Sequence, residues 1–251
     1  MYETVILFCR CTSGIISDDK INAIAEVVQK SGARVVELND LCALSIDNAG
    51  ELRKLNNRFQ KKIVIACYPR AVENILNQAS SPFQEMKVLN FRRLSAVEIE
   101  AELADMNGNR QENHEVLSSD LKVPAWFPVV EKKRCTDCGQ CAKFCLFGVY
   151  RYSDKQLIVE NPLNCKNNCP ACARSCPVSA IIFPRIKEDG AIAGAEPDEV
   201  RIDLSQQQTG SLLTRIQQRG DVRRTIFRSN LLQQAEEERR RAIEEFKKQN
   251  T

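Results

Sequence analysis

Eight of the twelve cysteines in this 251-residue chain lie between positions 135 and 176. They fall in two runs, CTDCGQCAKFC and CKNNCPACARSCP, and the first run has the spacing C-x2-C-x2-C-x3-C. The second run repeats this order of spacings with one additional residue between its first two cysteines. The fold of this segment must therefore accommodate eight thiols on short loops, either as disulfides or as metal ligands.

The start of the chain indicates which of these two uses to expect. The apolar run before Cys9 is shorter than the roughly 7 to 15 apolar residues of a signal-peptide core, so we expect a cytoplasmic protein. No run approaches the roughly 18 apolar residues of a transmembrane helix, so membrane association would require a partner protein. In a chain without an export signal, such cysteine clusters bind metal more often than they form disulfides.

The spacing favours iron-sulfur clusters over zinc. A 4Fe-4S cluster needs four thiolates at the corners of a tetrahedron, and three closely spaced cysteines can wrap a cluster while a fourth arrives from elsewhere. Zinc is also bound by C-x2-C pairs, but two zinc sites leave the repeated C-x3-C ending of each run unexplained. Two 4Fe-4S clusters are therefore the prediction, and a pair of structural zinc sites is the alternative.

The same segment resembles the bacterial two-cluster ferredoxins. The sequence CPVSAIIFP after the second run is similar to the closing turn and strand of that family, whereas Leu146 stands where the family usually has proline. The resemblance implies that the fourth cysteine of each run serves the other cluster. One ligand set would be Cys135, Cys138, Cys141 and Cys176, and the other would be Cys165, Cys169, Cys172 and Cys145.

Residues 1–106 have the pattern of an α/β domain. Short apolar runs such as TVILF and KKIVIAC alternate with longer segments of helical periodicity, in the order βαβαβαβα. Continuous apolar strands of this kind are typical of a parallel sheet that is buried on both faces. Ser17 or Asp18 is expected to cap the first helix, and Gly32 to end it.

The other four cysteines follow the predicted strands of this domain. Cys9 and Cys11 come after the first strand, Cys42 after the second, and Cys67 at the end of the third. Because the carboxyl ends of parallel strands meet at one edge of the sheet, where ligands bind, we predict a third 4Fe-4S cluster there. The alternatives are a redox-active thiol, a site for a single metal ion, or burial of each cysteine as a small apolar residue.

These stretches also resemble the N-terminal domain of the flavin-binding subunit of heterodisulfide reductase. The similarity lies in FCRCTSG, LCALSIDNAGEL, IACYPRAVENIL and SPFQEMKVLNFR. In that family the corresponding cysteines serve a 4Fe-4S cluster, which implies this role for the four cysteines here. The family usually has a further cysteine near NFRRLS, where this chain has none, and the G-x-G-x-x-G motif of a flavin-binding body does not occur in this sequence.

The rest of the chain divides into linkers, the ferredoxin domain and a tail. Residues 107–134 are polar or contain proline and are predicted to be a linker, with His114 in a solvated loop. Trp126 and Phe127 are expected to pack on the neighbouring domain or to contact a partner protein. The remaining predicted segments are a ferredoxin domain at 135–185, a linker at 186–210 and a helical tail at 211–251.

The tail carries one narrow apolar stripe that is interrupted by Glu238. An isolated helix with so little apolar surface is marginal in water, so we expect it to pack on its own domain or to dock on another chain. A frayed, solvated tail is the alternative. The stripe consists of Phe227, Leu231, Ala235, Ala242 and Phe246.

The predicted fold is an α/β N-terminal domain with a parallel sheet, a small α+β ferredoxin-like two-cluster domain and a C-terminal helical tail. A net charge of +3 from 36 basic and 33 acidic residues is too even for a nucleic-acid-binding surface. The sequence shows no phosphate-binding loop and no flavin motif, and its single histidine has no catalytic setting. We therefore expect an electron-transfer subunit that is not an enzyme by itself.

Such a subunit is expected to pass electrons between a low-potential donor and a partner oxidoreductase in a hetero-oligomer. The catalytic site would lie on the partner, which would be a flavin, molybdenum or tungsten, or heterodisulfide-reductase-like protein. The alternative function is a structural or regulatory module, in which metal only braces a domain that recruits a partner.

Three 4Fe-4S clusters predict about 12 irons per chain after anaerobic reconstitution. Assays of iron and acid-labile sulfide on the full chain measure this number. A result of about eight irons would leave only the two ferredoxin clusters, and zinc in place of iron would contradict the prediction at every site.

Overall fold

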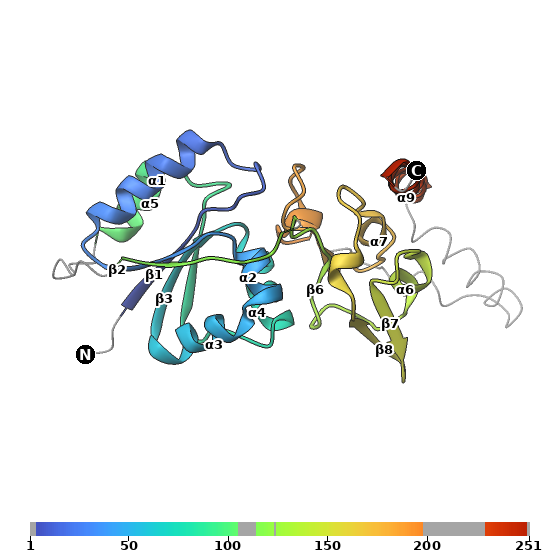
Figure 1. The fold of residues 1–251 in the computed structure, drawn as a ribbon, viewed down its shortest axis with the longest axis horizontal. Helices are drawn as coiled ribbons and strands as arrows, with labels where there is room; N and C mark the ends of the chain where they lie inside the picture. The colour runs from blue at the N-terminus through green and yellow to red at the C-terminus, as the bar shows by residue number, and fades with distance from the viewer. Residues whose placement is uncertain (1–3, 105–113, 123, 198–228, 250–251) are drawn as a thin grey trace, which may run out of the picture.

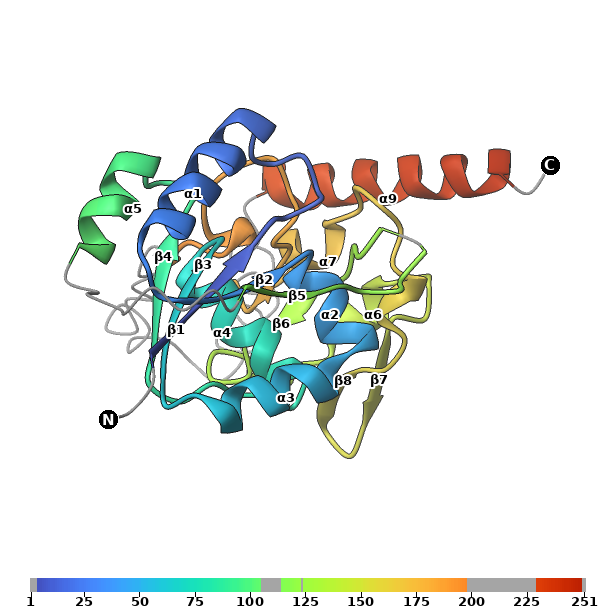
Figure 2. The same cartoon turned by 60° about the vertical axis from the view of Figure 1, so that its left-hand side comes forward.

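The computed structural model describes residues 4–104, 114–122, 124–197 and 229–249. An α/β part comes first, and a smaller part with two short strand pairs follows it (Figure 1). A long C-terminal helix lies beside the smaller part (Figure 2).

Five parallel strands form the sheet of the α/β part, in the spatial order β4-β3-β1-β2-β5. The chain passes from β1 to β2 on one side and then places β3 on the other side of β1. Open α/β sheets bind ligands where the strand order reverses in this way, at the carboxyl ends of the strands. The prediction of a parallel α/β sheet is confirmed. The strands are β1 Thr4–Cys9, β2 Arg34–Leu38, β3 Lys61–Ala66, β4 Met86–Asn90 and β5 His114–Leu117.

Helices cover both faces of this sheet. α1 and α5 pack together on one face, and α3 and α4 lie on the opposite face (Figure 1). α2, which was not predicted as a separate helix, follows β2 directly. The helices are α1 Asp18–Lys30, α2 Leu41–Asp47, α3 Ala49–Arg58, α4 Pro69–Gln78 and α5 Ala96–Leu103.

Side-chain caps decide where three of these helices begin. Ser17 caps α1 by accepting a hydrogen bond from the Lys20 N–H at 3.4 Å, as the sequence predicted. Asp40 caps α2 in the same way, at 3.1 Å from the Ala43 N–H. Ser95 and the glutamate three residues later form a reciprocal capping box at the start of α5. Each cap contributes about 1 kcal/mol, and the cap at Asp40 also fixes the loop that precedes Cys42.

The prediction of a linker at 107–134 is wrong in two places. Residues 114–117 form the edge strand β5, and residues 125–130 are buried. An edge strand forms through backbone hydrogen bonds to its neighbour and needs no continuous apolar pattern, so periodicity did not reveal it. His114 lies in this strand and not in a loop, with Nε2 at 3.4 Å from the Glu37 carboxylate.

The smaller part contains two antiparallel strand pairs and two short helices. The pair β6-β9 lies against α4 of the α/β part, while β7 and β8 form a hairpin between the two cysteine runs. α6 and α7 each lie inside one cysteine run. The elements are β6 Val129–Val130, α6 Gln140–Phe144, β7 Tyr150–Ser153, β8 Gln156–Val159, the 3-10 turn η1 Pro162–Asn164, α7 Ala171–Arg174 and β9 Ile181–Ile182.

Two consecutive aromatic residues join the cores of the two parts. Trp126 stacks on Phe183 inside the smaller part, with ring centroids 5.3 Å apart. Phe127 packs instead in the core of the α/β part. Both side chains are buried, which confirms the prediction that they pack on a neighbouring domain.

A buried arginine connects the two parts. The Arg70 side chain on α4 is only 3% exposed. Its Nε donates to the Glu131 carboxylate at 2.8 Å, and its Nη1 donates to the Ala191 and Ala195 carbonyls at 2.8 and 3.1 Å. Its Nη2 donates to the Ser179 carbonyl. These partners offset the cost of removing a guanidinium from water.

Residues 186–197, which were predicted to begin a linker, lie in the same interface. The 3-10 turn η2 (Ala191–Ala193) is followed by Gly194, whose φ is +113°. A Cβ at Gly194 would lie 2.6 Å from the Ala71 Cβ, so only glycine allows this approach. The linker prediction is wrong here because close backbone packing, which leaves no periodic pattern, positions the segment.

The described part of the tail is a single helix, α9 (Ser229–Gln249), which lies along α7 (Figure 2). Ala235 and Ala242 are buried against the smaller part. Glu238, which interrupts the apolar stripe, pairs with Arg174 at 2.8 Å. The helix therefore packs on its own chain, and Phe227 of the predicted stripe lies outside the described residues.

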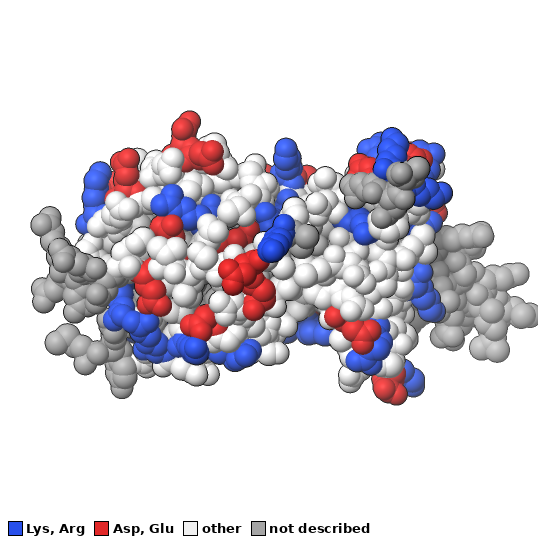
Figure 3. Space-filling view, viewed as in Figure 1, with Lys and Arg blue, Asp and Glu red and all other residues white. Residues whose placement is uncertain are grey.

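On the face shown in Figure 3, basic and acidic side chains are interspersed. Among the helices that the structure describes, none is long and apolar enough to cross a bilayer.

Replacing Arg70 tests the connection between the parts. Arg70→Met should lower the free energy of unfolding by about 3–5 kcal/mol, because Glu131 and three carbonyl groups lose a buried donor. Urea titration under anaerobic conditions measures the change. Arg53→Met removes an exposed arginine of α3 and should change stability by less than about 0.5 kcal/mol. Equal effects of the two variants would contradict this role of Arg70.

Candidate metal centres

Two hollows in the smaller part are each lined by four cysteines. The first hollow has an empty volume of about 310 Å³ and is lined by Cys135, Cys138, Cys141 and Cys176. The second hollow has an empty volume of about 320 Å³ and is lined by Cys145, Cys165, Cys169 and Cys172. Each hollow thus takes three cysteines from one run and the fourth from the other, which is the grouping that the ferredoxin resemblance implies.

A residue with left-handed backbone precedes the second cysteine of each run. Asp137 has φ of 49° and Asn168 has φ of 59°. Aspartate and asparagine tolerate this conformation better than other non-glycine residues. It directs the Asp137 N–H toward Cys135 Sγ at 3.4 Å. The additional residue of the second run lengthens the loop before Asn168 but leaves the turn into Cys169 in the same conformation.

Polar hydrogens also approach sulfurs from outside the cysteine loops. The Ala180 N–H donates to Cys176 Sγ at 3.3 Å, and the Tyr150 hydroxyl donates to Cys172 Sγ at 3.1 Å. Hydrogen bonds of this kind stabilise negative charge on a ligating sulfur and tune the metal group it holds.

Burial raises the pKa of three thiols in each hollow. Desolvation, with a further contribution from Cys176, raises the pKa of Cys141 to about 12. Burial likewise raises the pKa of Cys165 and Cys172. Thiols that react as nucleophiles have a lowered pKa. Here the thiolate form requires a nearby positive charge, which a bound metal supplies.

The arrangement of the thiols favours a cluster over a single ion. Zinc holds four thiolates at about 2.3 Å, so its ligands must converge closely on one point. A 4Fe-4S cluster fills the space between its ligands and carries them at its corners. Within the described residues, no three cysteine, histidine, aspartate or glutamate side chains form a site for one metal ion. The residues present therefore fit a four-thiolate cluster.

The structure gathers the four N-terminal cysteines at the carboxyl edge of the sheet. Cys9 is the last residue of β1, Cys67 follows β3, and Cys42 lies in the first turn of α2. Cys11 follows in the loop after β1 with φ of 52°, an uncommon conformation for a residue with a Cβ. Cys9, Cys42 and Cys67 are buried, and Cys11 is partly buried.

These four sulfurs lie close enough to influence one another. The pKa of Cys42 is raised first by burial, then by Asp40 and by each of the other three cysteines. Burial, with a contribution from Cys11, raises the pKa of Cys67 to about 12. Raised values disfavour a reactive redox thiol and are compatible with buried metal ligands or apolar thiols.

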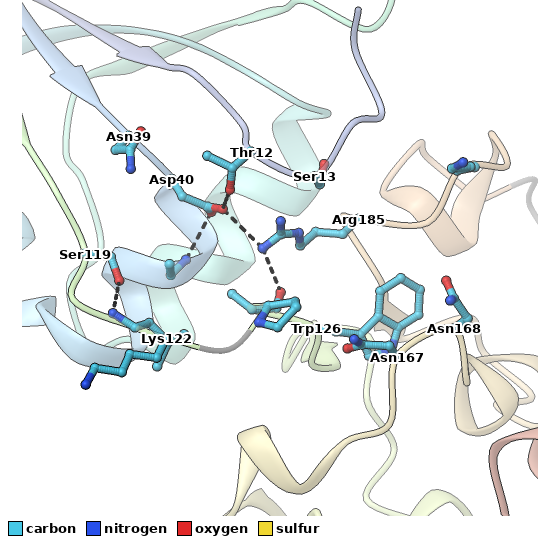
Figure 4. A pocket seen from close by; sticks show the side chains of 15 residues that line it. Thr12, Ser13, Asn39, Asp40, Ser119, Lys122, Trp126, Asn167, Asn168 and Arg185 are labelled. Atoms are coloured by element: carbon cyan, nitrogen blue, oxygen red, sulfur yellow. Dashed lines mark hydrogen bonds and ion pairs between the residues drawn. The ribbon is translucent and has the colours of Figure 1, made fainter. Parts of the chain in front are cut away.

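A polar cleft lies beside this group, between the two parts of the molecule (Figure 4). Its volume is about 480 Å³. Arg185 of the smaller part reaches across it to the Asp40 carboxylate at 3.1 Å and donates to the Ala125 carbonyl at 3.4 Å. Asp40 also accepts from the Thr12 hydroxyl at 2.6 Å. An arginine from the smaller part thus occupies part of the edge at which an open sheet binds ligands.

The cleft lies between two candidate metal centres. Thr12 and Ser13, which follow Cys11, line one side. Asn167 and Asn168 of the second cysteine run line the other side, together with Trp126 (Figure 4). The cleft therefore separates the N-terminal cysteine group from the loop that borders the second hollow.

Sequence reasoning missed several polar residues around these sites. Asp40 had a detectable signal, since a helix-capping residue stands two positions before Cys42. Tyr150 and Arg185 had none, because their positions against Cys172 and Asp40 arise only when distant segments come together.

Comparison with known proteins finds a related segment. A stretch of 61 residues is 39% identical to an uncharacterized ferredoxin of Methanocaldococcus jannaschii and covers 24% of this chain. The match covers 42% of that ferredoxin, so the chain spans less than half of the relative's length. The chain contains a ferredoxin-like region. No protein-family profile and no solved structure matches it.

The grouping of cysteines around the hollows is testable by paired substitutions. Cys145→Ser should perturb the same paramagnetic signal as Cys169→Ser, because both residues line the second hollow. Cys176→Ser should perturb the signal that Cys138→Ser perturbs. Electron paramagnetic resonance of the four reconstituted variants makes the comparison. Grouping by position along the chain, with Cys145 beside Cys138, would contradict the assignment.

Proposed function

We propose that this chain is an iron-sulfur electron carrier with one 4Fe-4S cluster in each of the two hollows. The observation that carries the proposal is that each hollow combines three cysteines of one run with the fourth cysteine of the other. This exchange of ligands is typical of two-cluster ferredoxins. The similarity of 61 residues to a ferredoxin supports it.

A 4Fe-4S cluster accepts and releases single electrons. The chain's residues provide the surroundings that this exchange needs. Val149 borders the second hollow and Leu157 the first, and both are buried, so part of each wall is apolar. The hydrogen bonds from Tyr150 and Ala180 stabilise the thiolate ligands Cys172 and Cys176.

We propose that Cys9, Cys11, Cys42 and Cys67 hold a third 4Fe-4S cluster. Their convergence at one sheet edge and their mutual effect on pKa support this role. The resemblance to the N-terminal domain of the flavin-binding subunit of heterodisulfide reductase points the same way. A third cluster beside the cleft would give electrons a second point of entry or exit.

The partner in this proposal is a separate redox enzyme within a hetero-oligomer. The sequence has no motif for binding a flavin or a nucleotide phosphate, so the chemistry on substrate would take place on that partner. A flavin, molybdenum or tungsten, or heterodisulfide-reductase-like protein would fit.

Visible spectroscopy separates electron transfer from a bracing role for metal. The reconstituted chain should show a broad brown absorption that dithionite bleaches and air-free reoxidation restores. A colourless protein that contains zinc would contradict the proposal. A brown protein that cannot be bleached and restored would favour the structural or regulatory module.

The N-terminal cluster has its own test. The double variant Cys42→Ser/Cys67→Ser removes two buried thiols from the sheet edge and should lower the iron content from about 12 to about 8 per chain. A Ser13→Ala variant changes a residue beside Cys11 without removing a thiol and should keep about 12. An unchanged iron content in the double variant would contradict the third cluster.

A further inference from the structure

The two hollows are closely similar in size and in cysteine arrangement, but they differ in charge. The lining residues of the first hollow include no charged side chain, although the Asp137 carboxylate lies 3.7 Å from Cys135 Sγ and is itself paired with Lys132 at 3.7 Å. The second hollow has one, Arg239, which comes from α9 and not from the cysteine segment. This difference in charge would change the electrostatic surroundings of any metal group held in the second hollow.

Arg239 is held against the second hollow by contacts with the residue before Cys145. Its guanidinium carbon lies 4.4 Å from the centre of the Phe144 ring. Its Nη1 donates to the Phe144 carbonyl at 3.5 Å. Arg239 lines the second hollow together with its four cysteines. Its positive charge therefore lies at the border of the space that a metal group would occupy.

The packing of α9 on the smaller part fixes the position of Arg239. Ala235 and Ala242, one helical turn to either side of Arg239, are buried, and their small side chains let the helix approach Cys169 and Ala171. Both carboxylate oxygens of Glu238 accept from Arg174 Nε, at 2.8 and 2.9 Å. Arg174 lies within the second cysteine run, so the helix is attached to the segment that forms the hollow.

We propose that Arg239 stabilises the reduced form of the iron-sulfur group in the second hollow, so that two matched groups have different reduction potentials. This inference rests on the proposed function. Reduction adds one electron and hence one negative charge, and a cation nearby lowers the energy of the reduced state more than that of the oxidised state. The low dielectric of the apolar walls strengthens the effect.

The other charges around Arg239 do not remove this effect. Glu238 is the residue before Arg239, but its carboxylate is paired with Arg174 at 2.8 Å. Arg174 also binds Glu188 through both terminal nitrogens at 2.9 Å, so these three residues form one network. The ion pairs of the described residues give Arg239 no carboxylate partner. Electrons would therefore settle on the second hollow in preference to the first.

The test uses the full reconstituted chain, a dithionite redox titration and paramagnetic resonance. The signal of the second hollow is first identified as the one that Cys169→Ser perturbs. Arg239→Gln should then lower the reduced-to-oxidised ratio of this group about tenfold at a fixed potential, a shift of about 59 mV. The reduction potential of the group in the first hollow should stay unchanged. Arg239→Lys keeps the positive charge and should therefore keep the second group's potential close to that of the unaltered chain.

Arg241→Gln is the matched control. It removes the same charge two residues along α9, from a side chain that is 71% exposed. Its potentials should equal those of the unaltered chain. Glu238→Gln keeps hydrogen-bonding capacity for Arg174 and removes a negative charge, so it should shift the second group in the opposite direction.

The outcomes separate this inference from the proposed function. A chain without iron, or without reversible reduction, would overturn the proposed function itself. If both groups are reversibly reduced, the proposed function stands. The role of Arg239 alone is then overturned if Arg239→Gln and Arg241→Gln shift the second group's reduction potential equally, or if neither variant shifts it. If Arg239→Gln loses iron, the Glu238→Gln variant provides the test. A reduction potential of the second group that is unchanged or lowered in Glu238→Gln overturns the inference.

Discussion

The burial of the Arg70 guanidinium is the constraint on which the arrangement of the molecule depends. A charge removed from water must be met by hydrogen-bond acceptors with good geometry. Its acceptors come from three separate segments, at Glu131, at Ser179, and at Ala191 and Ala195. The strand before the first cysteine run, the turn after the second run and the 3-10 turn η2 are thereby fixed to one helix of the α/β part.

A second set of contacts continues this connection toward the N-terminal cysteines. Tyr68 directly follows Cys67, and its hydroxyl donates to the Asp189 carboxylate at 3.0 Å. Arg92 pairs with the same carboxylate at 2.9 Å and also donates to carbonyls of the 186–188 segment. The surroundings of Cys67 are therefore built partly from the smaller part. For an electron carrier with clusters in both parts, such contacts would keep the separation between clusters constant.

The two cysteine hollows show how a repeated unit acquires different properties. Each run forms a left-handed turn before its second cysteine and a short helix after it, and the hollows have nearly equal volumes. What distinguishes them lies outside the repeat. Tyr150 donates to a sulfur of the second hollow, and α9 places Arg239 at its border. Local sequence thus forms the two sites, and segments added around them set their electrostatic surroundings.

Sequence alone determined the elements that depend on local periodicity and spacing. The strands β1 to β4, the cap at Ser17 and the parallel α/β sheet all follow from patterns within a few residues. The strand β5, the buried segment 125–130 and the interface segment 186–197 were decided only by the tertiary structure, because they are held by contacts with distant residues. The same reason applies to the sites. Spacing made eight cysteines candidate ligands, and positions after the predicted strands did the same for the other four. Only the folded chain brings Arg185 to Asp40 and Arg239 to the second hollow. Side chains that act across long sequence separations leave no periodic signal, since their partners are chosen by packing.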